Sequence, residues 1–161
     1  MAADEDKKSD DRLVKVELDD AGMPRRSAEA EQERAIAIYD LLEENIFSLH
    51  DRSGPYHLCL RLEGRHVHFD IREVTDKSLI QFFMAMGPLR RVMRDYFHVC
   101  DTYYEAIRTK SPSQIQAIDM GRRALHNEGS ELLQARLDGK VKTDFQTARR
   151  LFTLICVLHS R

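Results

Sequence analysis

Two runs of alternating apolar and polar residues, separated by a two-residue turn, constrain the fold of this chain most. The runs span residues 56–63 and 66–72, and Gly64 and Arg65 lie between them. Such alternation is typical of strands, because successive side chains point to opposite faces. Pairing around the turn places three apolar pairs opposite each other: Leu62 with Val67, Leu60 with Phe69, and Leu58 with Ile71. The sequence therefore predicts an antiparallel hairpin with one wholly apolar face.

Weaker strand and helix patterns surround the hairpin. Residues 12–18 are predicted as a short strand, and residues 80–86 as either a third strand or a short helix. Ser27 can cap a helix whose first turn carries Glu29 and Glu31, because acids suit the positive N-terminal end of a helix. We expect that helix to run to about residue 47, with one apolar face made of Ala35, Ile38, Tyr39, Leu42 and Ile46.

The C-terminal half is predicted to be helical. Pro88 stands at a tolerated first helical position, and a buried stripe follows at helical spacing, made of Leu89, Val92, Met93, Tyr96, Cys100, Tyr103 and Ile107. Residues 111–114 and 143–146 each match a capping box, so helices are expected over residues 112–137 and 144–159. We therefore expect an α+β fold. A small antiparallel sheet, made of the hairpin and one or two further strands, packs against four helices, and the C-terminal half is all helical.

Length and composition indicate a single domain. The 161 residues, 42% of them hydrophobic, suffice for a packed core that needs no stabilisation by a metal or by disulfide bonds. Residues 1–11 are polar and lack periodicity, so they are expected to form a disordered tail. Residues 12–161 then form one α+β domain.

Neither a membrane nor a secreted environment is expected. The longest apolar stretch, residues 79–89, is interrupted by Gln81, Gly87 and Pro88, whereas a membrane-spanning helix needs about 20 mostly apolar residues. The N-terminus has no apolar region behind a basic one, as a signal peptide would. The three cysteines are widely spaced and odd in number, which argues against a disulfide framework or a thiolate zinc site. We expect a cytoplasmic protein.

Arginine pairs are the most prominent feature of the basic C-terminal half. Residues 87–161 carry 13 Lys and Arg against 8 Asp and Glu, although the net charge of the chain is −2. The pairs are Arg90 with Arg91, Arg122 with Arg123, and Arg149 with Arg150. Guanidinium groups bind phosphate or carboxylate in bidentate fashion, and the first and third pairs lie in opening helical turns, which favour anions.

Two explanations of these pairs remain open. They could converge on an anionic ligand, or each arginine could reach an internal acid; we favour the internal network. Adjacent helical residues diverge by roughly 100°, so we expect at most one arginine of each pair to point to a shared centre.

Residues 119–130 form the densest polar segment of the chain. The side chains that can touch at helical spacing are Asp119, Arg122, Arg123, His126 and Asn127. His126 with Asp119 or Glu128 could act as a general base, although a histidine fixed by its neighbours is the commoner case. Gly121 and Gly129 each cost about 1 kcal/mol inside a helix, which indicates close approach of another backbone or a bound group.

The second face of the predicted hairpin carries His57, Cys59, His66, His68 and Asp70. Cys59 and Asp70 are expected opposite each other with His68 diagonal to Cys59, so a metal site is geometrically conceivable. A solvated sheet face often carries such residues, and we expect neither a metal nor a cofactor.

Several sequence motifs together resemble those of the bacterial "uncharacterised protein family 0262". They are residues 38–45, 54–56, 90–91, 95–97, 113–123, 126–130, 136–140 and 147–154. The resemblance covers nearly everything from residue 12 to residue 159. It implies a small cytoplasmic bacterial protein and carries no known activity.

The sequence leaves two classes of function. The first is a non-enzymatic binding or interaction module, which could be a homodimer, whose arginines hold an anionic partner such as a nucleotide, RNA or an acidic protein surface. The second is an enzyme acting on a small phosphorylated or carboxylated substrate, with arginine clamps and His126 or a nearby acid in proton transfer. The phosphate loops of nucleotide-binding proteins and the common RNA-binding motifs are missing from the sequence, although nucleic acid is not excluded as a partner.

Overall fold

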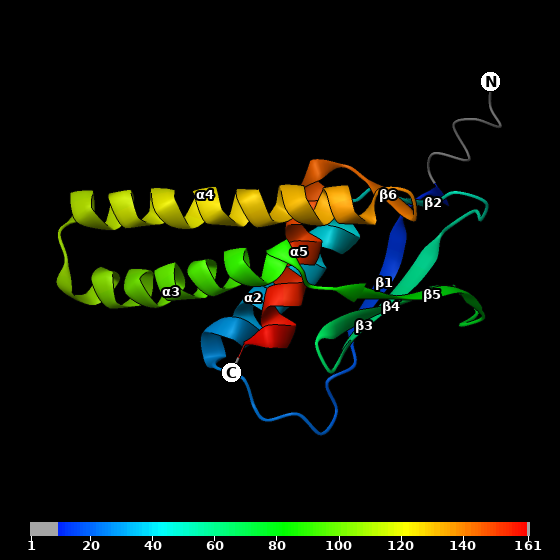
Figure 1. Ribbon diagram of the computed structural model, residues 1–161, viewed down its shortest axis with the longest axis horizontal. Coiled ribbons are helices and arrows are strands. Elements are labelled where there is room, and N and C mark those ends of the chain that lie inside the picture. The colour runs from blue at the N-terminus through cyan, green and yellow to red at the C-terminus, as the bar shows by residue number, and fades with distance from the viewer. Residues whose placement is uncertain (1–9, 161) are drawn as a thin grey trace.

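The computed structural model describes residues 10–160 and has an α+β fold with ten main elements (Figure 1). The strands are β1 (Leu13–Leu18), β2 (Phe47–Leu49), β3 (Tyr56–Glu63), β4 (His66–Glu73), β5 (Ser78–Ala85) and β6 (Val141–Thr143). The helices are α2 (Ala28–Glu43), α3 (Pro88–Thr109), α4 (Pro112–Leu137) and α5 (Phe145–His159). No helix in the described part of the chain has the length and apolar character to cross a lipid bilayer.

The predicted hairpin is confirmed, register included. Strands β3 and β4 pair so that Leu58 faces Ile71, Leu60 faces Phe69 and Leu62 faces Val67. Strand β5 adds to the outer side of β4 and resolves the predicted choice at residues 80–86 in favour of a strand. The sheet order is β1-β3-β4-β5. Strand β1 lies parallel to β3, so the sheet is mixed.

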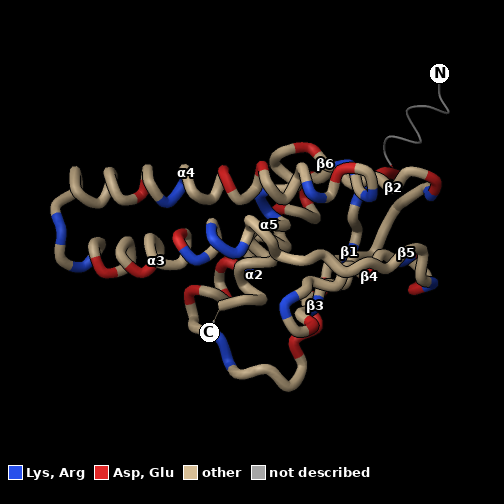
Figure 2. Tube along the Cα trace, in the orientation of Figure 1, with Lys and Arg blue, Asp and Glu red and all other residues tan. Residues whose placement is uncertain are grey.

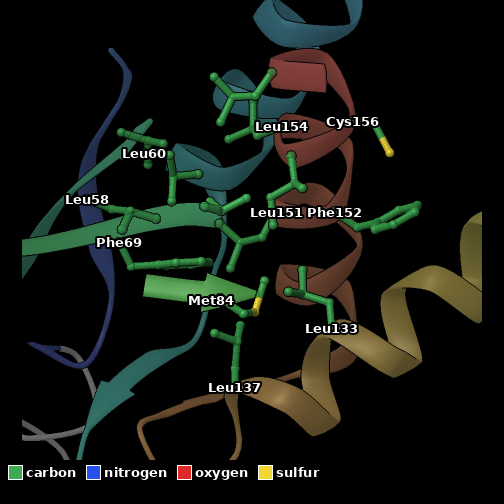
Figure 3. Packing of buried hydrophobic residues seen from close by; sticks show 14 of the residues in the cluster. Leu58, Leu60, Phe69, Met84, Leu133, Leu137, Leu151, Phe152, Leu154 and Cys156 are labelled. Carbon is green, nitrogen blue, oxygen red and sulfur yellow. The ribbon is translucent and has the colours of Figure 1, made fainter. Parts of the chain in front are cut away.

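Helix α5 forms the centre of the core. Figure 3 shows Leu151 and Leu154 directed towards the sheet, whereas Phe152 points to the other side, towards α4. Nine of the residues of α5 are buried. Helices α2 and α4 both pack against α5, so this short helix joins the sheet to the remaining helices.

The helices α3 and α4 form a long antiparallel hairpin that extends past α5 (Figure 1). The predicted start and end of α4 are confirmed, as is the capping box at Ser111 and Gln114. The predicted buried stripe of α3 is correct as far as Cys100, but Tyr103 is only partly buried and Ile107 is half exposed.

The structure corrects three further expectations. Helix α2 ends at Glu43, and residues 47–49 instead form β2, which pairs with β6. The buried face of α2 consists of Ala30, Ala37 and Leu41, so the predicted face was wrong: Tyr39, Leu42 and Ile46 are exposed. The cap of α5 is Asp144, whose carboxylate accepts from the N–H of Thr147 at 3.0 Å; the predicted box of Thr143 and Gln146 does not form, because Thr143 belongs to β6.

Residues 1–9 of the predicted tail lie outside the described residues. The carbonyl of Asp11, at the end of that predicted tail, accepts a hydrogen bond from the backbone N–H of Phe47 at 3.1 Å. Asp11, which the sequence placed in the tail, is therefore held against β2 by this hydrogen bond.

Candidate functional site

A recess of about 410 Å³ lies among α2, α3, α4 and α5. We call it the arginine recess, because four of its lining residues are arginines. The lining residues are Glu33, Ile36, Ala37, Asp40, Tyr96, Arg122, Arg123, His126, Arg149, Arg150 and Thr153. Its size falls within the range usual for small-molecule sites.

Asp119 holds the arginine pair of α4. Arg122 donates to its carboxylate from Nε at 3.0 Å and from Nη2 at 2.6 Å, and Arg123 Nε lies 3.0 Å from the other oxygen. The hydrogen bond from Arg122 lowers the pKa of Asp119 against the opposing effect of burial. Arg122 also lies over the ring of Tyr103, 4.6 Å from its centroid. This part of the site is the internal network that the sequence suggested.

The arginine pair of α5 is held much more loosely. Arg149 Nη1 contacts the amide oxygen of Gln146 at 3.4 Å, and Arg150 Nη1 donates to the Gln146 carbonyl at 3.1 Å. Arg150 Nε lies 3.8 Å from Asp40, which is an ion pair but too long for a hydrogen bond. The Nε atoms of both arginines are buried without a hydrogen-bond partner in the described part of the chain. Most N–H donors of these two guanidinium groups therefore make no hydrogen bond to the described part of the protein.

His126 lies between the two arginine pairs. Its Nε2 is 2.8 Å from the hydroxyl of Thr153, and that hydroxyl donates to the carbonyl of Arg149 at 3.2 Å. Because the hydroxyl has one proton, His126 Nε2 is the donor in this pair, and Nδ1 is an acceptor. Nδ1 is buried without a partner within residues 10–160. Burial, followed by the charges of Arg149 and Arg122, lowers the pKa of His126 to about 4.

The general-base arrangement suggested for His126 is not present. Asp119 is occupied by Arg122 and Arg123, and the polar contact of His126 is with Thr153. The ring of His126 packs edge-on against Tyr96 and Phe152, with centroids 5.3 and 5.2 Å away.

The two glycines of α4 have different surroundings. A Cβ atom at Gly129 would overlap the ring of Phe152, so the close approach predicted there is made by a side chain of α5. At Gly121 no protein atom lies within 4 Å of the corresponding position, so the close approach of another backbone predicted there was wrong.

The remaining predicted residues are not part of the recess. Arg90, Arg91, Asn127 and Glu128 are exposed and do not line it. Both arginines of each of the other two pairs do line it. The expectation of one arginine per pair was therefore wrong, because long flexible side chains can bend back from divergent Cα–Cβ directions.

Two acids and an aromatic residue of the recess were not predicted as site residues from the sequence. Glu33 and Asp40 come from α2, and Tyr96 comes from α3. Glu33 accepts a hydrogen bond from the hydroxyl of Tyr104 at 3.1 Å. The spacing of Glu33, Ile36, Ala37 and Asp40 at three and four residues could have identified a single helical face, had the buried face of α2 been assigned correctly.

The second face of the hairpin is polar yet largely buried. His57 and His68 are each 2% exposed and Asp70 is 5% exposed. His57 Nδ1 lies 2.7 Å from Asp76, and Arg72 donates to Asp70 at 2.6 Å. The expectation of a solvated face was therefore wrong. Within residues 10–160 no three His, Cys, Asp or Glu residues are grouped so that they could hold a metal ion.

Fold and recess together define a small α+β protein in which a helical layer, held on one central helix, carries an arginine-lined hollow. The chain belongs to the Uncharacterised protein family (UPF0262), whose model matches residues 10–161. It is 53% identical over 151 residues to a UPF0262 protein of Paramagnetospirillum magneticum, covering 93% of this chain and 96% of the relative. A relative from Azorhizobium caulinodans is 56% identical over 151 residues, covering 92% and 93% of the two chains.

The same similarity extends to a UPF0262 protein of Brucella canis, which is 53% identical over 152 residues and covers 93% and 94% of the two chains. The family resemblance inferred from the sequence motifs is thus confirmed. These relatives are bacterial. No solved structure matches the chain at a significant level.

Proposed function

We propose that the protein is a non-enzymatic binding module that holds a small phosphate- or carboxylate-bearing ligand in the arginine recess. The unsatisfied Nε–H donors of Arg149 and Arg150 support this most directly. Six buried side-chain atoms within residues 10–160 lack a hydrogen-bond partner, and three of them, on Arg149, Arg150 and His126, belong to the recess. Buried polar groups are normally satisfied, so their concentration at one hollow favours a polar ligand.

The charge of the recess supports an anion. Four arginines line it against two carboxylates, Glu33 and Asp40, and Asp119 pairs with both arginines of α4, which leaves an excess of one positive charge. The arginines of α5 have free donors on flexible side chains, whereas those of α4 are fixed by Asp119. In the proposed complex the α4 pair supplies a rigid positive wall, and Arg149 and Arg150 close on the ligand.

Binding suits the recess better than proton transfer. A histidine whose pKa is about 4 is neutral at physiological pH and is a weak base. The lining residues include no serine, cysteine or lysine among those described. We also propose that the protein works in the cytoplasm, because its three cysteines are unpaired, as is usual where thiols are kept reduced.

The proposal is tested by measuring the Tm of the protein at increasing concentrations of inorganic phosphate and of citrate. At a phosphate concentration ten times the dissociation constant, binding stabilises the folded state by about 1.4 kcal/mol, or a rise in Tm of about 3–6 °C. The double substitution Arg149→Gln, Arg150→Gln should abolish this rise. Replacing the exposed pair Arg90 and Arg91 by Gln removes the same charge and serves as the matched control. An equal rise in all three proteins, or no rise with either anion, would refute the proposal.

A further inference from the structure

Strand β5 is one edge of the four-stranded sheet, and its outer backbone is open. It pairs with β4 along residues 78–85. Within residues 10–160, Arg136 donates a side-chain hydrogen bond to the carbonyl of Ala85 at the last residue of the strand. No backbone group outside β4 bonds to the strand in that part of the chain.

The composition of β5 gives this edge little protection. Six of its eight residues are apolar, and it contains no charged residue and no proline; Figure 2 shows it tan along its length. Phe83 is 52% exposed. A register shift leaves Leu79 unmatched near the start, and residues 80–85 then pair regularly with β4. Proteins usually blunt exposed edges with charges, prolines or covering segments, because unpaired strands recruit other strands.

Strand β1, the opposite edge of the same sheet, is protected by a covering side chain and by charged residues. On β1, the side chain of Asn45 accepts from the backbone N–H of Leu13 at 2.7 Å and donates to its carbonyl at 2.9 Å. Lys15 and Glu17, 3.3 Å apart, add charges of both signs along this strand. The two edges of one sheet therefore differ, and β5 alone of the two retains a neutral, apolar and regular stretch.

We propose that β5 pairs antiparallel with β5 of a second copy of this chain, which joins two four-stranded sheets into one of eight strands. A two-fold axis makes an antiparallel strand its own complement, so the same patch serves both copies. The absence of charge means that the self-pairing brings no like charges together. An axis near the middle of residues 80–85 places the two exposed Phe83 rings close together, where aromatic contact adds to the backbone hydrogen bonds.

This interface is independent of the arginine recess. The recess is lined by residues of α2, α3, α4 and α5, with none from β5. A dimer formed through β5 thus carries two recesses, and each remains complete without the partner copy.

Sedimentation and light scattering of the full chain test the interface. The wild type should have twice the 18.7 kDa chain mass, about 37 kDa, at micromolar concentration. Phe83→Lys places like charges beside the two-fold axis and should raise the dimer dissociation constant about tenfold or more. Because Phe83 is exposed, the variant should stay folded, which circular dichroism verifies.

Two control variants separate this interface from others. Val74→Lys adds the same charge at a residue that is 59% exposed and precedes β5, and it should leave the dimer intact. Tyr39→Lys changes the exposed face of α2, where Tyr39 is 65% exposed, and should also leave it intact. A monomeric wild type, a dimer that survives Phe83→Lys, or a dimer lost on Tyr39→Lys would each overturn the proposal.

Discussion

At Gly129 the ring of Phe152 passes so close to α4 that no side chain can be accommodated. Phe152 is fully buried, so its ring can make room only by displacing its neighbours, and Gly129→Ala should destabilise the fold by about 2–3 kcal/mol through overpacking. Gly121→Ala in the same helix is the matched control, because nothing lies within 4 Å of its Cβ position. It should stabilise the fold by up to about 1 kcal/mol. Urea unfolding measures both, and equal effects of the two substitutions would contradict this packing.

His126 makes the stability of the fold depend on pH. Its pKa is about 4 in the folded state against an ordinary value of 6.5, so the unfolded chain takes up a proton first as the pH falls. Stability is therefore complete above about pH 6.5, decreases towards pH 4 and changes no further below that through this group. The decrease should amount to about 3 kcal/mol. In His126→Gln, urea unfolding between pH 7 and 4.5 should show a shallower decrease; an unchanged slope would contradict this assignment.

Individual residues were predictable only where local spacing decides their partners. Asp119 meets Arg122 and Arg123 because residues three and four apart on a helix are neighbours. The contact of His126 with Thr153 joins positions 27 residues apart. It depends on how α4 crosses α5, which the sequence of either helix alone does not encode.

The start of α5 shows the same limit for an element. Asp144 caps the helix, and replacing it with Ala should cost about 1 kcal/mol. Thr143→Val should cost less, since the Thr143 hydroxyl is buried without a partner within residues 10–160. Thermal unfolding of the two variants compares them. A larger loss for Thr143→Val would instead support the capping box that the sequence suggested.

Helix α2 shows why its buried face was assigned wrongly. Its sequence contains two apolar stripes, one with Ala37 and Leu41 and the other with Tyr39 and Leu42. Both have helical spacing, and the choice between them is made by packing on α5, a helix more than 100 residues away in the chain. Strand pairing in the hairpin was predictable because the turn at Gly64 brings neighbours together and fixes the register.

The whole molecule depends on α5, which joins the sheet on one side to α2 and α4 on the other. The α+β class, the hairpin and the helices of the C-terminal half followed from periodicity, because each is built from contacts close in sequence; the expectation that this half is all helical was wrong, because β6 lies between α4 and α5 and pairs with the distant β2. The recess did not follow, because it combines α2 with three later helices. The parallel pairing of β1 with β3 was not predicted for a similar reason, because the α2 segment lies between the two strands in the chain.

The binding of an anion by Arg149 and Arg150 is the central claim, and the Nε–Hε resonances of the arginines report on it most directly. Both Nε–H groups lack a hydrogen-bond partner in the described part of the free protein. Titration with inorganic phosphate, followed by proton–nitrogen correlation spectra, should shift these two resonances saturably and leave those of Arg90 and Arg91 in place. Resonances that stay fixed, or that shift equally at all four arginines, would contradict a binding site in the arginine recess.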